Sequence, residues 1–265
     1  MKIITLLLIL LCAFLFFWYF YNIPILDNFE NSEKKLHLYV ITLKHEDRLK
    51  NIKTQQSKID NHIELFDAVK GDFLNIDEII NKYKFSSNFF SNTFIDDKKR
   101  KREVGCYLSH LNLYRNIKNE HRFGYTIVFE DDFNLDNNFI NAINNIISIT
   151  EEKNIDFDII FLGQNATTNK GDFITDNLFN LNNNQDLWGT HGLLINNRNI
   201  DKIIEKTEYI DTPIDIKLGN LGKSNNLNIL ISHPYIVTTI PVKSDINDLS
   251  IETFYSDYRT AYSYL

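Results

Sequence analysis

The sequence of 265 residues contains only two cysteines, Cys12 and Cys106, so disulfide bonds cannot form the framework of the fold. It also lacks a basic excess, because 35 acidic residues against 28 basic ones give a formal net charge of −7 at pH 7. Proteins that bind nucleic acid without sequence preference normally carry a positive surface that displaces counterions. The composition therefore disfavours a nucleic-acid-binding protein.

Long apolar runs are also scarce, and the single one extends from Ile3 to Tyr21. As a helix rising about 1.5 Å per residue it would span roughly 28 Å, close to the hydrocarbon thickness of a bilayer. Trp18 lies near its end, where aromatic rings favour the membrane interface. A cleavable signal peptide is the alternative, but its apolar stretch is normally shorter and small residues follow it. We therefore expect a signal-anchor transmembrane helix over residues 1–22.

The charges around this run suggest an orientation. Lys2 precedes it, whereas Asp27 and Glu30 follow it. Because cytoplasmic flanks are enriched in Lys and Arg, the pattern favours a cytoplasmic N-terminus. We expect a single-pass type II membrane protein with a short polar stem over residues 23–35. Its catalytic domain would be lumenal, as in the endoplasmic reticulum or Golgi, or otherwise extracytoplasmic.

Residues 36–241 have the composition and patterning of one globular domain. Hydrophobic residues make up 43% of the chain and charged residues 24%, which excludes a disordered chain, a collagen-like repeat and a multi-pass membrane protein. The predicted strands are residues 36–43, 62–69, 125–129, 158–162, 193–195 and 227–232, and the predicted helices are residues 44–58, 76–83, 103–117, 137–149 and 198–206. Their alternation predicts an α/β domain with a mostly parallel sheet. Residues 242–265 would form a C-terminal tail.

Two polar segments are expected to be surface loops. One is the Asn-rich stretch 177–184, and the other is the basic cluster Lys98–Arg102. By composition the basic cluster also resembles a localisation or nucleic-acid-binding signal. Contact with an anionic acceptor is a further hypothesis for it.

Three consecutive carboxylates, Glu130, Asp131 and Asp132, follow the predicted strand 125–129. Open α/β sheets bind ligands at the C-terminal ends of their strands. Clustered anions repel one another, and a bound divalent cation is the usual compensation. Oxygen ligands favour Mg²⁺ or Mn²⁺, particularly with diphosphate oxygens. The alternative is a solvated acidic turn that begins the next helix.

Several motifs occur in an order that resembles glycosyltransferase family 25. A helix with the pattern Gly-Cys-x-x-Ser-His, residues 105–110, precedes the Glu-Asp-Asp turn. The other matching segments are residues 40–43 with Asp47 and Arg48, 64–71, 158–163, 189–195 and 213–215. Lys70 departs from the pattern, because an acidic residue is more usual there. The resemblance covers roughly residues 38–235.

This resemblance implies a GT-A-type, Rossmann-like domain that binds a nucleotide sugar, commonly UDP-galactose, and often Mn²⁺ (or Mg²⁺). The partners would be a UDP-sugar donor and a glycan or hydroxylysine-type protein acceptor, with no nucleic acid. Asp131 and Asp132 would bind the metal, and Glu130 would contact the donor. Expulsion of a diphosphate requires such a cation to neutralise the leaving group.

The remaining donor-binding residues come from strand ends and from the Ser-His helix. Thr42, Arg48, Asp67 and Ala68 would surround the nucleoside, although Arg48 could equally be a surface charge. Ser109 is assigned to the donor site. His110 is assigned to the catalytic site, with a structural role as the alternative. Ser109 and His110 are not a hydrolase pair, because adjacent helical residues do not face each other.

Three aromatic side chains further along the chain complete the predicted site. His233, after a strand, is the candidate third metal ligand. Trp188 and His191 are assigned to the acceptor site, where Trp188 would stack on a sugar; a buried structural role is the alternative for each.

A base for an inverting transfer must lie on the face opposite the leaving diphosphate. Asp215 is the candidate, because it follows Pro213 at the start of a predicted helix and two isoleucines flank it. Apolar surroundings would raise its pKa and make it a better base. A purely structural Asp at a helix start is the alternative.

The sequence thus predicts a metal-assisted, inverting glycosyltransferase, most simply a galactosyltransferase. A catalytically inactive family member that acts as a lumenal binding or scaffold protein is one alternative. A metal-dependent nuclease that uses Glu130–Asp132 is another, and the negative net charge disfavours it.

Overall fold

The computed structural model describes residues 35–86, 89, 97–121, 123–165, 171–175, 177–181, 186–240 and 246. Among these residues, no helix has the length and apolarity needed to cross a bilayer. The predicted anchor over residues 1–22, nearly all of the stem, and the tail apart from Ile246 lie outside the described residues.

An eight-stranded sheet forms the centre of the domain, in the order β2-β1-β4-β9-β6-β11-β8-β7. Its strands are β1 (Leu36–Thr42), β2 (Ile63–Asp67), β4 (Tyr125–Glu130), β6 (Ile159–Gly163), β7 (Asp172–Thr175), β8 (Leu178–Asn180), β9 (Gly192–Asn196) and β11 (Ile229–Ser232). Two small sheets pair β3 (Lys84–Phe85) with β10 (Tyr209–Ile210) and β5 (Phe133–Leu135) with β12 (Val237–Thr239).

The sheet is mixed, and this corrects the prediction of a mostly parallel one. β9 is antiparallel to both of its neighbours, β4 and β6, and β8 is antiparallel to β11 and β7. The hydrophobic pattern of a buried strand is the same in either direction, so it could not reveal this reversal. β9 therefore begins at the edge where β1, β2 and β4 end.

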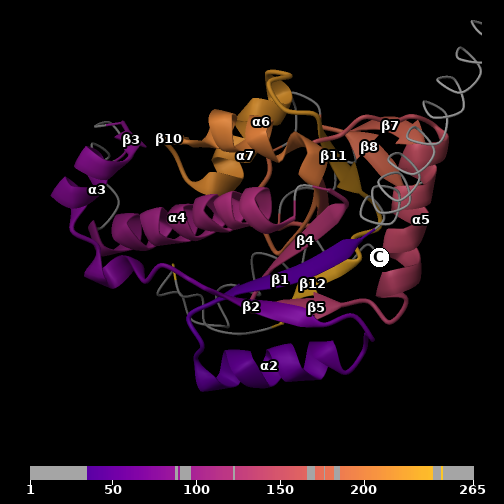
Figure 1. Ribbon diagram of the computed structural model, residues 1–265, viewed down its shortest axis with the longest axis horizontal. Helices are drawn as coiled ribbons and strands as arrows, with labels where there is room; N and C mark the ends of the chain where they lie inside the picture. Colours follow the sequence, from indigo (N-terminus) through magenta and orange to yellow (C-terminus); the bar gives the residue numbers. More distant parts are fainter. Residues whose placement is uncertain are drawn as a thin grey trace, which may run out of the picture.

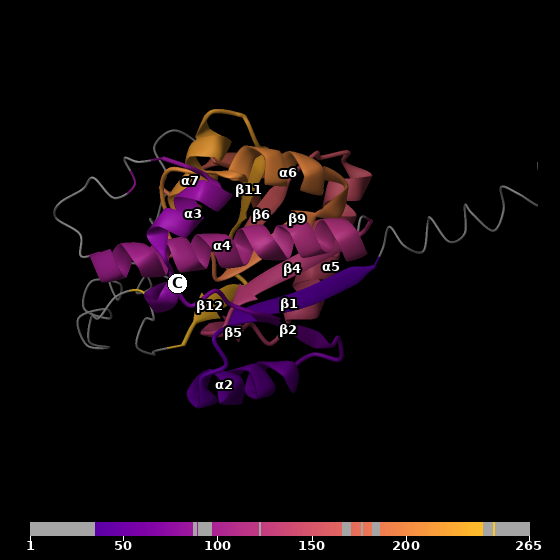
Figure 2. The same ribbon diagram turned by 60° about the vertical axis from the view of Figure 1, so that its left-hand side comes forward.

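Helices cover both faces of the sheet. The helices are α2 (Glu46–Gln56), α3 (Ile76–Lys82), α4 (Asp97–Glu120), α5 (Phe139–Glu152), α6 (Ile200–Thr207) and α7 (Ile214–Lys223), with short 3₁₀ turns at Gly71–Phe73 and Asn197–Asn199. α4, α6 and α7 lie on one face, whereas α2 and α5 lie on the other (Figures 1 and 2).

The two faces of β1 contribute to two separate hydrophobic clusters. Tyr39 and Ile41 pack with α4, α6 and α7, whereas Leu38 and Val40 pack with α2 and α5. Successive strand residues point to opposite faces, so a continuous apolar run is what a strand covered on both sides requires. The α/β expectation is confirmed at this level, as a Rossmann-like arrangement.

Two predicted loops are regular structure instead. The basic cluster 98–102 forms the first turns of α4, which begins at Asp97. Arg100 is buried and pairs with Glu103 at 3.2 Å, and Arg102 pairs with Asp72 at 2.8 Å. These ion pairs to the helix and to the neighbouring 3₁₀ turn allow a run of cations to be helical. The segment predicted as the loop 177–184 contains β8, which pairs with β11.

Candidate active site

Two adjoining cavities open at the edge of the sheet where β1, β2 and β4 end. One has a volume of about 280 Å³ and the other about 340 Å³. Cys106, Glu130, Asp132 and Ile246 line both of them. The acidic turn thus forms the wall between the two spaces. Ile246, the one described residue of the predicted C-terminal tail, is part of this wall.

Glu130 ends β4 and is held by three side chains. The hydroxyl of Thr190 donates a hydrogen bond to its carboxylate, and His110 Nε2 lies 3.2 Å from the same hydroxyl. His110 Nε2 and His191 Nδ1 lie 3.9 Å and 3.8 Å from the Glu130 oxygens. Burial alone would raise the pKa of Glu130, but the two imidazoles outweigh it and hold this pKa well below its usual range. Glu130 is therefore a carboxylate at neutral pH.

Glu130, Asp132 and His191 form a group that fits a divalent cation. One ligand atom from each lies within 4.8 Å of the other two. Within the described part of the chain, neither buried ring nitrogen of His191 has a hydrogen-bond partner, nor has Asp132 Oδ1. Buried polar atoms without partners are costly, and a coordinated ion would satisfy them. A donor set of two carboxylates and one imidazole suits Mn²⁺ better than Mg²⁺, which prefers oxygen alone.

The pKa values of this group respond to one another. Burial raises the pKa of Asp132, and the negative charge of Glu130 raises it further, against the opposing charges of His191 and Arg48. Burial would lower the pKa of His191, but Glu130 and Asp132 raise it above its ordinary value. Without a cation, a proton held by His191 or Asp132 offsets part of the negative charge of the two carboxylates.

Asp131, predicted as a metal ligand, is not part of that group. Its Oδ1 lies 3.6 Å from Arg48 Nη1, which also lies 3.4 Å from Asp132 Oδ2. Asn51 of α2 donates hydrogen bonds to the carbonyls of Asp131 and Phe133, and so fixes the backbone of the turn. Arg48 is 3% exposed, which excludes the surface-charge alternative.

The larger cavity contains most of the predicted donor-binding residues. Thr42, Arg48, Ala68 and Ser109 line it. The Ser109 hydroxyl is already engaged, because it donates to Gly105 O at 2.7 Å and accepts from the Val69 amide at 2.8 Å. Ser109 thereby joins α4 to the end of β2.

Asp67 does not line either cavity, in contrast to its prediction. Its carboxylate is exposed and pairs with Lys44. The strand alternation accounts for this, because Phe66 packs toward α4 and its neighbour points away from it.

The smaller cavity contains the predicted acceptor-binding and base residues. Trp188, which is 49% exposed, lines it together with Asp215. The Asp215 Oδ2 accepts a hydrogen bond from the Gly189 amide at 2.9 Å, and Oδ1 accepts one from the Ile216 amide at 2.8 Å. Burial raises the pKa of Asp215, against these hydrogen bonds. The carboxylate is thus both oriented and made more basic.

His110 and His233 do not line the cavities, although the sequence assigned His110 to catalysis and His233 to metal binding. His110 is fully buried behind Glu130 and Thr190, so it is placed to position Glu130 and not to contact a substrate. His233 packs against the rings of Phe179 and Tyr235. It follows β11, three strands from β4, which corresponds to about 14 Å. His191 occupies the place that was predicted for His233.

Sequence reasoning missed two residues of this site. Thr190 lies inside the segment 189–195, but nothing in its type indicated that it would hold Glu130. Glu103 of α4 lines the smaller cavity, and burial raises its pKa, against the opposing charge of Arg100. The predicted helix 103–117 contained Glu103, but nothing in the sequence pattern assigned this residue to the site.

Cys106 lines both cavities as a neutral thiol. Burial raises its pKa well above the ordinary value, and the surrounding carboxylates raise it further. A neutral thiol is a poor nucleophile and a poor metal ligand. A structural role therefore fits Cys106 better than a reactive one.

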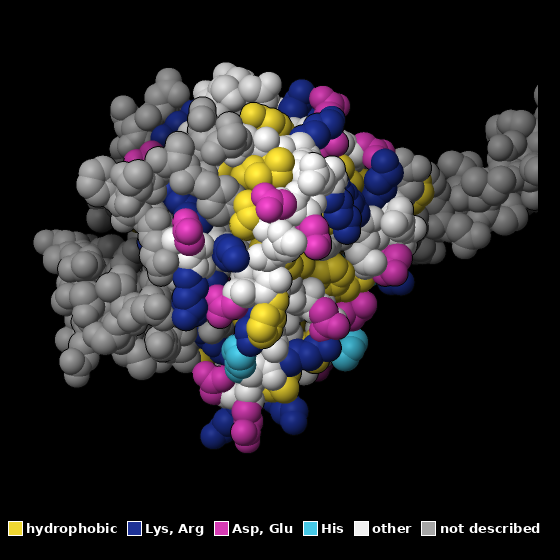
Figure 3. Space-filling model, turned by 90° about the vertical axis from the view of Figure 1, so that its left-hand side faces the viewer, with side chains coloured by type: hydrophobic (Ala, Val, Ile, Leu, Met, Phe, Trp, Pro, Cys, Tyr) yellow, Lys and Arg dark blue, Asp and Glu magenta, His cyan; other side chains and the backbone are white. Residues whose placement is uncertain are grey.

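The end of the molecule that carries α3 and the start of α4 is mixed in charge. In the coloured, described part of this face, acidic and basic side chains are interspersed (Figure 3). A continuous basic surface of the kind that tracks a nucleic-acid backbone is not seen there.

The family model described as "Glycosyltransferase family 25 (LPS biosynthesis protein)" matches residues 35–218. The match covers more than half of the chain, so the protein belongs to glycosyltransferase family 25. The resemblance drawn from the motifs is confirmed.

Similar curated proteins include two from Xenopus laevis and one from Bos taurus. Procollagen galactosyltransferases 1-A and 1-B of Xenopus laevis are each 27% identical over 128 residues, which is 48% of this chain and 21% of theirs. The Bos taurus "Probable inactive glycosyltransferase 25 family member 3" is 27% identical over 78 residues, which is 29% of this chain and 13% of that protein. The matches thus span about a fifth or less of the length of these relatives.

Proposed function

We propose that this protein is a metal-assisted, inverting glycosyltransferase with a GT-A-type domain, and that it transfers galactose from UDP-galactose to a hydroxyl acceptor. The observation that carries this proposal is the group Glu130, Asp132 and His191 on the wall between two cavities. A donor and an acceptor must meet at one reactive centre, and two adjoining cavities with a shared acidic wall provide that arrangement.

The larger cavity would bind the nucleoside diphosphate. Thr42 and Ala68 lie at the ends of parallel strands, where nucleotides bind in open α/β sheets. Asp132 and His191, with Glu130, would hold the Mn²⁺, which neutralises charge on the departing diphosphate. Arg48 lies beside both Asp131 and Asp132 and supplies a fixed positive charge there.

The smaller cavity would bind the acceptor. Trp188 offers an exposed ring on which a sugar face can pack, and Asp215 lies in the same space. Asp215 would take the proton from the acceptor hydroxyl as that oxygen attacks the anomeric carbon. The hydrogen bond from the Gly189 amide would orient the carboxylate for this step.

A panel of nucleotide-sugar donors, assayed with and without Mn²⁺, tests this proposal. Sugars and hydroxylysine peptides serve as acceptors, and hydrolysis of the donor is followed as well. We expect turnover of UDP-galactose only with the metal present. Binding of UDP-galactose without transfer or hydrolysis by any combination would contradict the proposal. It would favour the inactive alternative, a binding or scaffold protein, for which the bovine relative gives a precedent in name.

We further propose that residues 1–22 anchor the protein in a membrane as a type II protein, with the catalytic domain lumenal or extracytoplasmic. The apolar run Ile3–Tyr21 and the charges on either side of it support this. Carbonate extraction of membranes from expressing cells tests it. The full chain should stay with the membrane pellet, and a chain that starts at Asn31 should be released.

A further inference from the structure

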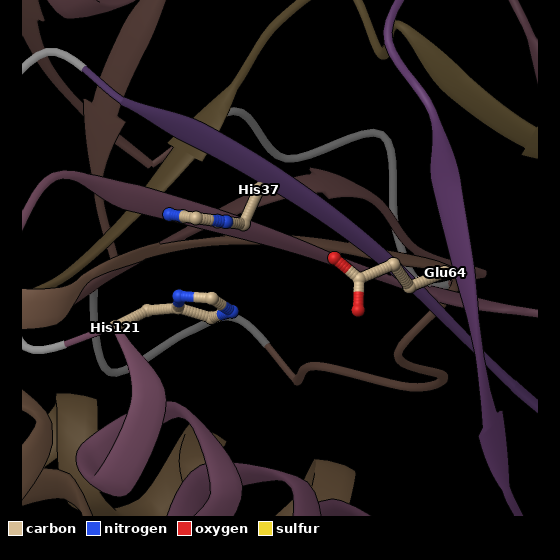
Figure 4. A group of neighbouring side chains, drawn as sticks. All are labelled: His37, Glu64 and His121. Atoms are coloured by element: carbon tan, nitrogen blue, oxygen red, sulfur yellow. The ribbon is translucent and has the colours of Figure 1, made fainter.

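A second group of metal-ligating side chains lies at the opposite end of β1. His37 in β1, Glu64 in β2 and His121, just after α4, each place one ligand atom within 4.8 Å of the other two. Figure 4 shows the imidazole rings one above the other, with the Glu64 carboxylate directed toward them. At about 3.3 Å per residue, His37 is roughly 17 Å from Thr42, so this group is separate from the candidate active site.

Three structural elements bring these side chains together. His37 and Tyr39 alternate with Leu38, so both lie on the side of β1 that faces α4. Glu64 is the register partner of Tyr39 on the adjacent strand. α4 runs along this face and delivers His121, whose ring stacks on that of His37 with centroids 3.6 Å apart and planes inclined by 20°.

The nitrogen atoms of His37 are available to a ligand. The side chain is 8% exposed, and no described residue forms a hydrogen bond with its ring. Burial lowers the pKa of His37 to about 4, and the charges of His121 and Lys35 contribute to the same direction. The imidazole is therefore neutral at pH 7, which is the form that binds metals.

The ring of His121 lies close to a tyrosine hydroxyl and to a carboxylate. His121 Nε2 lies 2.8 Å from the Tyr39 hydroxyl and 3.8 Å from Glu120 Oε2. Burial raises the pKa of Tyr39, and the charges of Glu64 and Glu120 raise it further, which places both carboxylates near that hydroxyl. Two imidazoles and the Glu64 carboxylate thus lie close together, with Glu120 beside His121 and Lys35 as the neighbouring cation. This is a nitrogen and oxygen donor set of the kind that zinc prefers.

We propose that His37, Glu64 and His121 bind a zinc ion, with Glu120, 3.8 Å from His121 Nε2, as the candidate fourth ligand. Zinc–ligand bonds of about 2.0 Å require ligand atoms roughly 3.3 Å apart, so the side chains must converge and the stacked rings must tilt. The ion takes the lone pair of His121 Nε2, and the Tyr39 hydroxyl then donates to a Glu64 oxygen. Such an ion would connect β1, β2 and the end of α4.

Competition between the full chain and a chromogenic zinc chelator tests the site. The measurement uses the background Glu130→Gln/His191→Gln, because Glu130 belongs to both of the other groups of potential ligands among the described residues. We expect one equivalent of Zn²⁺ to bind, and His121→Asn and Glu64→Gln each to lower the affinity about tenfold or more. Glu64 is exposed, so its substitution tests the site even where a histidine variant fails to fold. Co²⁺ in place of zinc should give the intense visible absorption of a tetrahedral site, and His121→Asn should remove it.

His62→Asn is the matched control, because this exposed histidine precedes β2 and lies outside the group. It should leave zinc affinity unchanged. Zinc affinity that is the same in His121→Asn and Glu64→Gln as in the background protein would overturn the proposal. An equal loss in His62→Asn would overturn it too. None of these measurements depends on sugar transfer, so their outcome is independent of the proposed function.

Discussion

Glu130 and His191 come from strands that run in opposite directions and meet at the same edge of the sheet. The Glu130 amide donates to the His191 carbonyl at 3.4 Å, and the side chains approach to 3.8 Å. Strand β4 ends at Glu130, whereas β9 begins one residue after His191. The antiparallel pairing therefore places a histidine beside the carboxylates, although the two residues are far apart in sequence.

Mn²⁺ binding should depend strongly on the carboxylate of Asp132 and less on that of Asp131. Asp132→Asn should lower Mn²⁺-dependent transfer about 10²-fold, because a neutral amide is a weak ligand for a hard cation. Asp131→Asn should have a smaller effect on Mn²⁺ affinity, since its carboxylate does not belong to the group formed by Glu130, Asp132 and His191. Calorimetric titration with Mn²⁺ and initial rates check this. Equal losses of metal affinity in both variants would contradict the assigned geometry.

The Thr190 hydroxyl should act by orienting Glu130. Thr190→Val removes the hydroxyl and retains the shape, so we expect kcat/KM to fall roughly 10- to 100-fold with a folded protein. Thr190→Ser keeps the hydrogen bond and is the matched control, with activity near that of the wild type. Steady-state rates and far-UV circular dichroism of the two variants provide the comparison. Loss of activity in both variants alike would point to packing instead.

Asp215 should give the acidic limb of the pH profile. A base must be deprotonated, so activity should fall as the pH drops through its pKa, which burial places above the usual value of about 3.9. Asp215→Asn should lower transfer about 10²-fold or more while UDP and Mn²⁺ still bind. Asp211→Asn is the control, because Asp211 pairs with Lys217 and does not line either cavity.

A structural role for Asp215 would give a different pattern. The melting temperature would fall, and turnover per folded molecule would stay close to that of the wild type. Wild-type transfer by Asp215→Asn would remove the base assignment.

Gly105 should be intolerant of any side chain. A Cβ there would lie 2.6 Å from Val69 O and 2.8 Å from Gly71 N, which are backbone atoms at the donor cavity. Gly105→Ala should lower the free energy of unfolding by about 1–3 kcal/mol and weaken UDP binding, because α4 must move away from that loop. Gly219→Ala, in α7, meets nothing closer than 3.5 Å and should be neutral or stabilising by up to about 1 kcal/mol. Urea denaturation of both variants measures the difference.

His37 should make stability depend on pH in acid. Its pKa is about 4 in the folded protein against 6.5 when unperturbed, so between these values the unfolded state binds more protons. The stabilisation is complete above pH 6.5 and is lost as the pH falls toward 4, by roughly 1–2 kcal/mol. With EDTA present, His37→Asn should flatten this part of the stability curve, whereas His62→Asn should not. An unchanged slope in His37→Asn would contradict the burial argument.

Most of the regular elements could be predicted from local patterns. The apolar run 36–43 and the triplet that ends β4 are signals within a few residues, and the structure contains both. The short strands β3, β5, β7, β8, β10 and β12 were missed, because two to four residues carry too little periodicity. Except for the pair β7–β8, their pairing partners come from distant parts of the chain.

The sequence by itself determined the family, the strand–helix alternation and the acidic turn, because each can be recognised from short motifs and their order along the chain. Only the tertiary structure decided which histidine joins the carboxylates. In a parallel sheet a residue before a strand lies at the opposite edge, so His191 seemed to be excluded and His233 favoured. Because β9 is reversed and adjacent to β4, His191 lies beside the acidic turn. His233 follows β11, which is three strands from β4. Direction and order are set by packing across the whole sheet, which no local pattern encodes.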